Sequence, residues 1–228
     1  FERNGNKIRM LWWGFIVLSN FLLGIFSAKY NLSIDMKLSI FWGIIIIAIL
    51  AWFVINQLWY KEFLRKVENL TPILEEENNA DKFIAENLSL LQGKKSMQII
   101  ALLSINICEG YCTKGDYQKA KAHLMKINPK KIHGILKLTY QLIFIYVLFY
   151  LEETEAATEK LSNHRDELLK FENSPELGAM ISIVQIFDLL SQKKKQEAHD
   201  LLLVSKEKWT INKYQKDFYY LASLCEKN

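Results

Sequence analysis

Two uninterrupted apolar stretches near the start of the chain decide its architecture: MLWWGFIVLSNFLLGIFSA at residues 10–28 and LSIFWGIIIIAILAWFVINQLWY at residues 38–60. Neither contains a charged residue, and each has about the 20 residues that a helix needs to cross roughly 30 Å of hydrocarbon. Aromatic side chains that favour the headgroup layer lie near their ends, including Trp12, Tyr30 and Trp59. The sequence predicts two transmembrane helices within a membrane anchor of residues 1–70.

The basic residues around these stretches predict their orientation. Three precede the first stretch and three follow the second within residues 61–66, whereas the connecting segment has only Lys29 and Lys37. Basic residues are retained on the cytoplasmic side of a membrane. We therefore expect a multi-pass protein of the cytoplasmic (inner) membrane, with the N- and C-termini in the cytoplasm and the short loop outside.

The alternative for the first stretch is a cleaved signal peptide. Its one candidate cleavage triplet, Phe26-Ser27-Ala28, has a bulky residue where signal peptidase requires a small one, which argues against cleavage. Because residue 1 is phenylalanine, we also expect a few residues to precede it.

The interior of the two stretches suits an anchor better than a channel or transporter. It has no carboxylate or base that could carry protons or ions. Asn20 is expected to form an interhelical hydrogen bond, and Gly14, Gly24 and Gly43 to allow close helix approach.

The remainder of the chain, residues 71–228, has the composition of a globular domain. Residues 61–228 contain 24 Lys and Arg against 23 Asp and Glu, which leaves no electrostatic basis for binding nucleic acid. An odd number of cysteines, three, argues against a disulfide-stapled extracellular domain and favours the reducing cytosol. The abundance of Ile, Lys and Asn suggests a bacterial source.

This region is predicted to be entirely helical. Apolar residues recur at three- and four-residue spacing, and Pro72, Pro129 and Pro175 fall at sensible helix boundaries. The segment ILKLTYQLIFIYVLFYL at residues 135–151 could be a third membrane helix, but its uninterrupted apolar part spans only 142–151, so we expect a buried core helix. The expected helices are 73–91, 95–113, 116–128, 132–151, 153–170, 175–192, 195–208 and 210–226.

One segment, ALLSINICEGYCTKGDYQKAKAHLMKINP at residues 101–129, resembles a tetratricopeptide repeat (TPR). Cys108 and Ala120 stand at the two small positions of that family, where two antiparallel helices approach closely, and Tyr111 stands at an aromatic position. The segment departs from the family pattern at Ser104, where tryptophan is usual, and its proline comes three residues early.

Weaker copies of this pattern surround it. Ala157 and Ala198 correspond to Ala120, and Ala80 could begin the series, at spacings of 40, 37 and 41 residues. The resemblance implies an all-α fold in which two transmembrane helices precede a TPR-like antiparallel helical solenoid at residues 71–228. An irregular helical bundle is the alternative.

No set of residues points to chemistry. Cys108 and Cys112 lie on one helix face, but they lack partners at the spacing of a zinc site and are better read as small core residues. The four histidines are dispersed, and no nucleophile is coupled to a base. We therefore expect no catalytic residues, no metal and no cofactor, and hence not an enzyme.

The last predicted helix carries more aromatic residues than one buried stripe requires. The surplus suggests a contact with a partner or a second copy of the chain, through Tyr214, Phe218, Tyr219 and Tyr220. The function expected on the resemblance is a membrane-anchored scaffold or adaptor whose cytosolic domain binds a protein or peptide. The alternative is an accessory subunit of a membrane transport or secretion complex. The expected partners are thus a protein or peptide and the lipid bilayer, with homo-oligomerisation possible and no nucleic acid.

Overall fold

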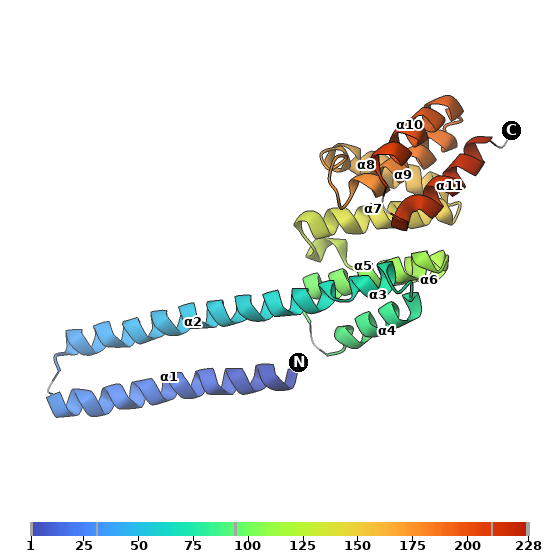
Figure 1. Cartoon of the computed structure of the whole chain (residues 1–228). Coiled ribbons are helices and arrows are strands. Elements are labelled where there is room, and N and C mark those ends of the chain that lie inside the picture. The colour runs from blue at the N-terminus through green and yellow to red at the C-terminus, as the bar shows by residue number, and fades with distance from the viewer. Residues whose placement is uncertain (1, 31, 94, 211, 227–228) are drawn as a thin grey trace. The chain divides into compact units, whose positions relative to one another are not determined.

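A computed structural model describes residues 2–30, 32–93, 95–210 and 212–226 (Figure 1). The described residues form helices and connecting segments without a strand, so the predicted all-helical class is confirmed. The chain divides into two compact units, Phe1–Asn69 and Leu70–Asn228.

The first unit is a hairpin of two long helices, α1 (Glu2–Tyr30) and α2 (Ile34–Glu68). They are joined where Ser33 caps α2, its hydroxyl accepting a hydrogen bond from the Met36 amide at 3.3 Å. Near the open end, the Trp12 indole N–H donates to the Ala48 carbonyl at 3.2 Å, and its ring lies 5.3 Å from that of Trp52. Both helices are long and apolar enough to cross a membrane.

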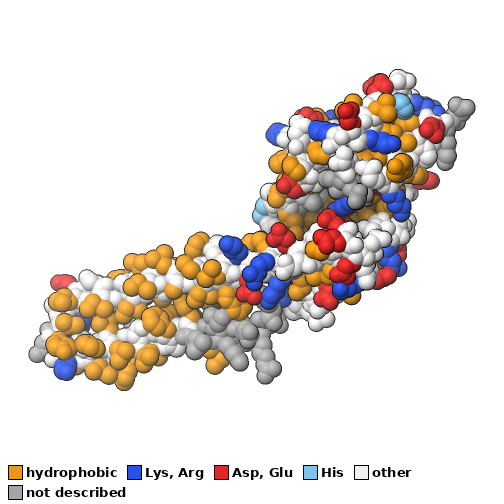
Figure 2. Space-filling view, in the orientation of Figure 1, with side chains coloured by type: hydrophobic (Ala, Val, Ile, Leu, Met, Phe, Trp, Pro, Cys, Tyr) orange, Lys and Arg blue, Asp and Glu red, His pale blue; other side chains and the backbone are white. Residues whose placement is uncertain are grey.

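The glycines of this hairpin do not contribute to the contact between its own two helices. A Cβ added at Gly14, Gly24 or Gly43 would meet no atom within 4 Å, so none of the three lies in the contact between α1 and α2. The Asn20 amide likewise donates within its own helix, to the Ile16 carbonyl at 2.8 Å. Aromatic and aliphatic side chains make the helix contact instead, and many others cover the hairpin surface (Figure 2).

The second unit begins with a break that the sequence analysis missed. A single helix was expected over 73–91, but the chain forms α3 (Thr71–Glu75) and α4 (Ala80–Leu91). Between them Asn78 takes a left-handed backbone conformation at φ 50°, and the Asn79 side chain caps α4 by accepting from the Lys82 amide at 3.0 Å. Asparagine tolerates a left-handed backbone and is also a favoured residue at the start of a helix, which explains why the helix is interrupted at these two residues.

The other helices follow the predicted order with ends that differ by a few residues. They are α5 (Met97–Thr113), α6 (Tyr117–Leu124), α7 (Gly134–Tyr150), α8 (Thr154–Leu169), α9 (Gly178–Ser191), α10 (Lys195–Lys208) and α11 (Asn212–Glu226). A 3₁₀ turn at Pro129–Lys131 precedes α7.

These helices pack in successive antiparallel pairs. α5 packs against α6, α7 against α8 and α9 against α10, while α5, α7, α9 and α11 also contact one another in that order. α7 lies at the centre, and ten of its 17 residues are buried. It is therefore a core helix of this unit, as its short apolar run predicted.

The two helices of each of these three pairs are joined by a turn of the same geometry. Gly115, Glu152 and Lys193 each have a left-handed φ, at 75°, 60° and 61°. In each turn the next amide donates to the carbonyl five residues earlier, at 2.9, 3.0 and 3.0 Å respectively. This is the Schellman arrangement that ends a helix, and here the following residue also begins the next helix. The turns recur after 37 and 41 residues, as the sequence spacing indicated.

The small positions predicted from these spacings are fully buried. Ala120, Ala157 and Ala198 are each 0% exposed, and each lies five residues after a left-handed residue. Ala80 does not fit this series, because it is the first residue of α4 and directly follows the cap. The residue in the corresponding place is Phe83, so the prediction for Ala80 was wrong in register.

Candidate functional site

A groove of about 590 Å³ opens in the second unit between helices that are distant in sequence. Side chains from α3, α5, α6, α7, α9 and α11 line it. Three of them are tyrosines, Tyr117, Tyr146 and Tyr214, and we refer to this pocket as the tyrosine groove. Its volume lies in the range of protein sites that hold a small ligand or a few side chains.

The groove has a buried carboxylate, that of Asp217 on α11, which is 7% exposed. Its Oδ1 accepts hydrogen bonds from the Tyr146 hydroxyl at 2.8 Å and from the Tyr150 hydroxyl. Burial raises the pKa of Asp217 above its ordinary value, and the two hydroxyls offset only part of that effect. Among the described residues, no cation forms an ion pair with this carboxylate.

Aromatic rings surround this carboxylate. Tyr117 stacks on Tyr150 with ring centres 4.4 Å apart and planes 10° apart, and Tyr146 lies 4.8 Å from Tyr150 at a tilt. Burial raises the pKa of all three tyrosines, so their hydroxyls stay protonated, as the hydrogen bonds from Tyr146 and Tyr150 to Asp217 require. The groove therefore places tyrosine side chains beside a buried acid.

An ion pair crosses the groove. Lys213 of α11 forms an ion pair with Glu109 of α5. Burial lowers the pKa of Lys213 below its ordinary value, and the carboxylates of Glu75 and Asp217 act against that lowering. Counting formal charges, the lining has the carboxylates of Glu75, Glu109 and Asp217 against the amines of Lys213 and Lys216, so its sum is −1.

The two cysteines on α5 behave differently from each other. Cys108 is fully buried in the core, whereas Cys112 lines the groove. A hydrogen bond with Cys108, and then burial, raise the pKa of the Cys112 thiol. Within the described ranges, no three His, Cys, Asp or Glu side chains gather closely enough to hold a metal ion.

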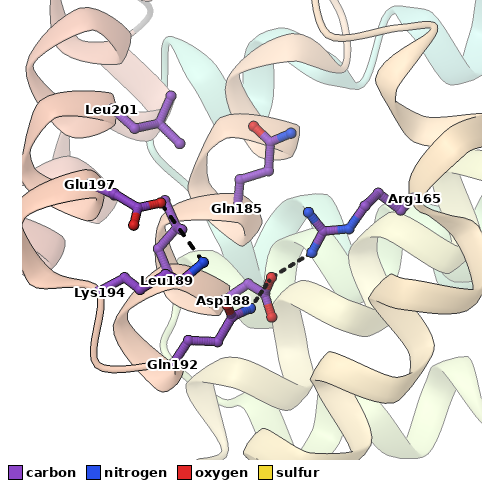
Figure 3. A pocket seen from close by; sticks show the side chains of 8 residues that line it. All are labelled: Arg165, Gln185, Asp188, Leu189, Gln192, Lys194, Glu197 and Leu201. Carbon is purple, nitrogen blue, oxygen red and sulfur yellow. Dashed lines mark hydrogen bonds and ion pairs between the residues drawn. The ribbon is translucent and has the colours of Figure 1, made fainter.

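A smaller pocket of about 370 Å³ lies among α8, α9 and α10 (Figure 3). At its base, Asp188 Oδ2 accepts hydrogen bonds from Arg165 at 2.6 Å and from Gln192 at 2.9 Å. Of the residues in the described ranges, none forms a hydrogen bond with the buried Asp188 Oδ1. Arg165 of α8 thus pairs with Asp188 of α9 and fastens the two helices together, while Lys194 pairs with Glu197 at the start of α10.

The four aromatic residues predicted as a contact surface do not share one face. Phe218 is fully buried in the core, and Tyr214 is buried at the wall of the tyrosine groove. Tyr219 and Tyr220 are 65% and 40% exposed, and Tyr220 stacks on Tyr150 at 5.5 Å. Phe218 packs against the helices of the core, so a partner contact through the exposed Tyr219 and Tyr220 is the part of the prediction that remains.

The residue that sequence reasoning missed is Asp217. It lies between Tyr214 and Phe218, both of which are buried, on the same helix. An acidic residue among core aromatics was the available signal, since burying a carboxylate is costly unless it serves a purpose. Its two tyrosine donors lie 71 and 67 residues away, which no local pattern reveals.

No protein family model matches this chain, and neither a curated protein nor a solved structure is significantly similar to it.

Proposed function

We propose that this protein is a membrane-anchored scaffold or adaptor. In this proposal α1 and α2 span the cytoplasmic membrane, both termini lie in the cytoplasm, and residues 70–228 form a TPR-like solenoid that binds a protein or peptide partner. The membrane assignment rests on the apolar surface of the hairpin and on the basic residues that flank it.

Two regularities support the TPR-like description. The three turns at Gly115, Glu152 and Lys193 share one hydrogen-bond pattern, and each is followed five residues later by a fully buried alanine. The first helices of successive pairs also contact one another in order. Stacked helix pairs of this kind present a continuous surface for a partner.

The tyrosine groove is the observation on which the binding function depends. Successive first helices, α5, α7, α9 and α11, all contribute to its lining. It combines ring faces with a buried carboxylate and a cross-groove ion pair, a mixture that suits the recognition of side chains. We propose that the partner is a peptide segment seated there and that binding involves no turnover.

The test compares two tryptophan variants of the full-length protein. Thr113 is exposed and lines the groove, so Thr113→Trp narrows it. Ser162 is exposed on α8 and lies outside the groove lining, so Ser162→Trp is the matched control. Each tagged protein is extracted in mild detergent from its native cells, and co-purifying proteins are quantified by mass spectrometry.

We expect a stoichiometric partner with the natural protein and with Ser162→Trp, and at least tenfold less of it with Thr113→Trp. Equal recovery from all three proteins would contradict the proposal.

The accessory-subunit alternative is favoured by one observation in the first unit. The surfaces at Gly14, Gly24 and Gly43 are open, so a helix of another protein could approach α1 or α2 closely there. In that case polytopic membrane proteins would co-purify with all three preparations and would be lost on Gly43→Ile.

A further inference from the structure

The buried carboxylate of Asp217 can accept more hydrogen bonds than it receives. Both of its hydrogen bonds, from Tyr146 and Tyr150, go to Oδ1. Among the residues that the structure describes, no donor contacts Oδ2 and no basic side chain lies within ion-pair distance of the carboxylate. Lys213 and Lys216 act on this carboxylate only from beyond ion-pair distance. A buried carboxylate without a close counter-cation is energetically unfavourable, and a cation entering the adjacent groove would relieve this cost.

The walls of the groove also favour a cation. Tyr117, Tyr146 and Tyr214 line it, and the face of an aromatic ring attracts a positive charge. Lys213 Nζ already lies over the Tyr214 ring, 5.3 Å from its centre. Tyrosine rings additionally pack well against the methylene stem of a long basic side chain.

The charged residues that line the groove also favour a cationic ligand over an anionic one. Lys213 is held by its ion pair with Glu109, so it is not free to receive an anion. What remains of the lining is Glu75 and Asp217 against Lys216, a formal sum of −1. An anionic ligand would find only Lys216 outside that ion pair, beside the carboxylates of Glu75 and Asp217, whereas a cationic ligand would meet an excess of negative charge.

We propose that the tyrosine groove binds a basic side chain, arginine or lysine, of the partner peptide. The cationic head lies against Asp217, and its stem lies along Tyr117, Tyr146 and Tyr214. This inference rests on the proposed peptide-binding function and specifies which kind of peptide is bound.

The experiment measures binding of small side-chain probes to the full-length protein. The protein is held in nanodiscs of phosphatidylcholine, which is zwitterionic and does not itself attract cations. The probes are N-acetyl-arginine methylamide, N-acetyl-lysine methylamide, the uncharged citrulline analogue of the arginine probe, and the anionic glutamate analogue. Ligand-observed NMR titration gives a dissociation constant for each probe.

Three variants make the test specific. Asp217→Asn removes the charge but keeps an oxygen that can accept from Tyr146 and Tyr150. Lys216→Glu is a change at an exposed position of the lining, and it adds negative charge. Glu197→Gln removes an exposed carboxylate from the smaller pocket and is the control.

We expect saturable binding of the arginine and lysine probes, and at least tenfold weaker binding of the citrulline and glutamate probes. Asp217→Asn should weaken the arginine probe at least tenfold, Lys216→Glu should strengthen it severalfold, and Glu197→Gln should leave it unchanged. Because the effect of Lys216→Glu is a gain of affinity, it cannot arise from misfolding.

Equal affinity for the arginine and citrulline probes, a preference for the glutamate probe, or no binding of any probe would overturn the inference. If the partner nevertheless co-purifies and is lost with Thr113→Trp, the scaffold function stands and only the cation specificity fails. If co-purification is also insensitive to Thr113→Trp, both proposals fail.

Discussion

At the start of α9, Gly178 lies directly beneath the indole of Trp209. A Cβ at residue 178 would fall 2.4 Å from Trp209 Cζ2 and 2.7 Å from the Glu172 carbonyl oxygen. Because one obstacle is backbone, Gly178→Ala should destabilise the protein by about 1–3 kcal/mol. Thermal unfolding in detergent measures the loss. Gly43→Ala, where the added methyl meets open space, is the control and should not lower the melting temperature.

Asp217 should make the stability of the protein depend on pH in a definite direction. Burial raises its pKa in the folded state, so the folded protein holds this proton more tightly than the unfolded chain does. The stabilisation is present below the unfolded-state pKa and is lost as pH rises through the folded-state value. We therefore expect Asp217→Asn to gain stability relative to the natural protein over that window.

The measurement is the difference in melting temperature between Asp217→Asn and the natural protein, from about pH 3 to pH 8. A difference that does not change with pH would contradict the burial argument. Other ionisable groups face this carboxyl in both proteins, so subtraction largely removes their contributions. They are Glu75 of α3, Glu109 and Cys112 of α5, Tyr117 of α6, Tyr146 and Tyr150 of α7, and Lys213 and Lys216 of α11.

At the scale of the helix pair, two adjacent alanines in α8 allow a matched test of whether a small residue at position 157 is needed for α7 and α8 to pack. Ala157 is 0% exposed, whereas Ala156 is exposed. Ala157→Leu forces extra volume between α7 and α8 and should cost about 1–3 kcal/mol, while Ala156→Leu should be near neutral. Denaturant unfolding of the two variants distinguishes them. Equal stabilities would show that close approach at Ala157 does not hold the pair together.

The sequence predicted the elements whose signal is local. The three-residue and four-residue apolar spacing located α5 to α11, and the alanine spacing anticipated the turns before α6, α8 and α10. It did not reveal the break at Asn78, because the surrounding residues have helical preferences. Nor could it show that Gly43 faces away from α1, since the rotation of a helix in an apolar hairpin leaves no periodic trace.

The candidate site could not be predicted from the sequence, because its residues come from helices that are distant along the chain. Tyr146 and Asp217 are brought together only when α7 and α11 pack on α9. The aromatic excess of the last helix was noticed, yet its members divide between the core, the groove and the surface according to their angle around α11. Only the three-dimensional packing assigns them.

For the whole molecule, the proposed topology can be tested with single cysteines in a background lacking Cys108, Cys112 and Cys225. A cysteine replacing Ser33, between α1 and α2, should react in intact cells with a membrane-impermeant maleimide. A cysteine replacing Ser162 should react only after the cells are permeabilised. Labelling of both positions in intact cells would place the second unit outside the cytoplasm.

The most direct test of partner binding is site-specific photocrosslinking in native cells. A photoreactive amino acid is placed in turn at Thr113 and Met180 of the tyrosine groove, at exposed Met125 outside it, and at exposed Val17 on α1. We expect one discrete adduct from the two groove positions, containing a peptide with arginine or lysine at the crosslink, and none from Met125. Adducts confined to Val17 would instead show that the membrane helices hold the partner, and that the groove does not.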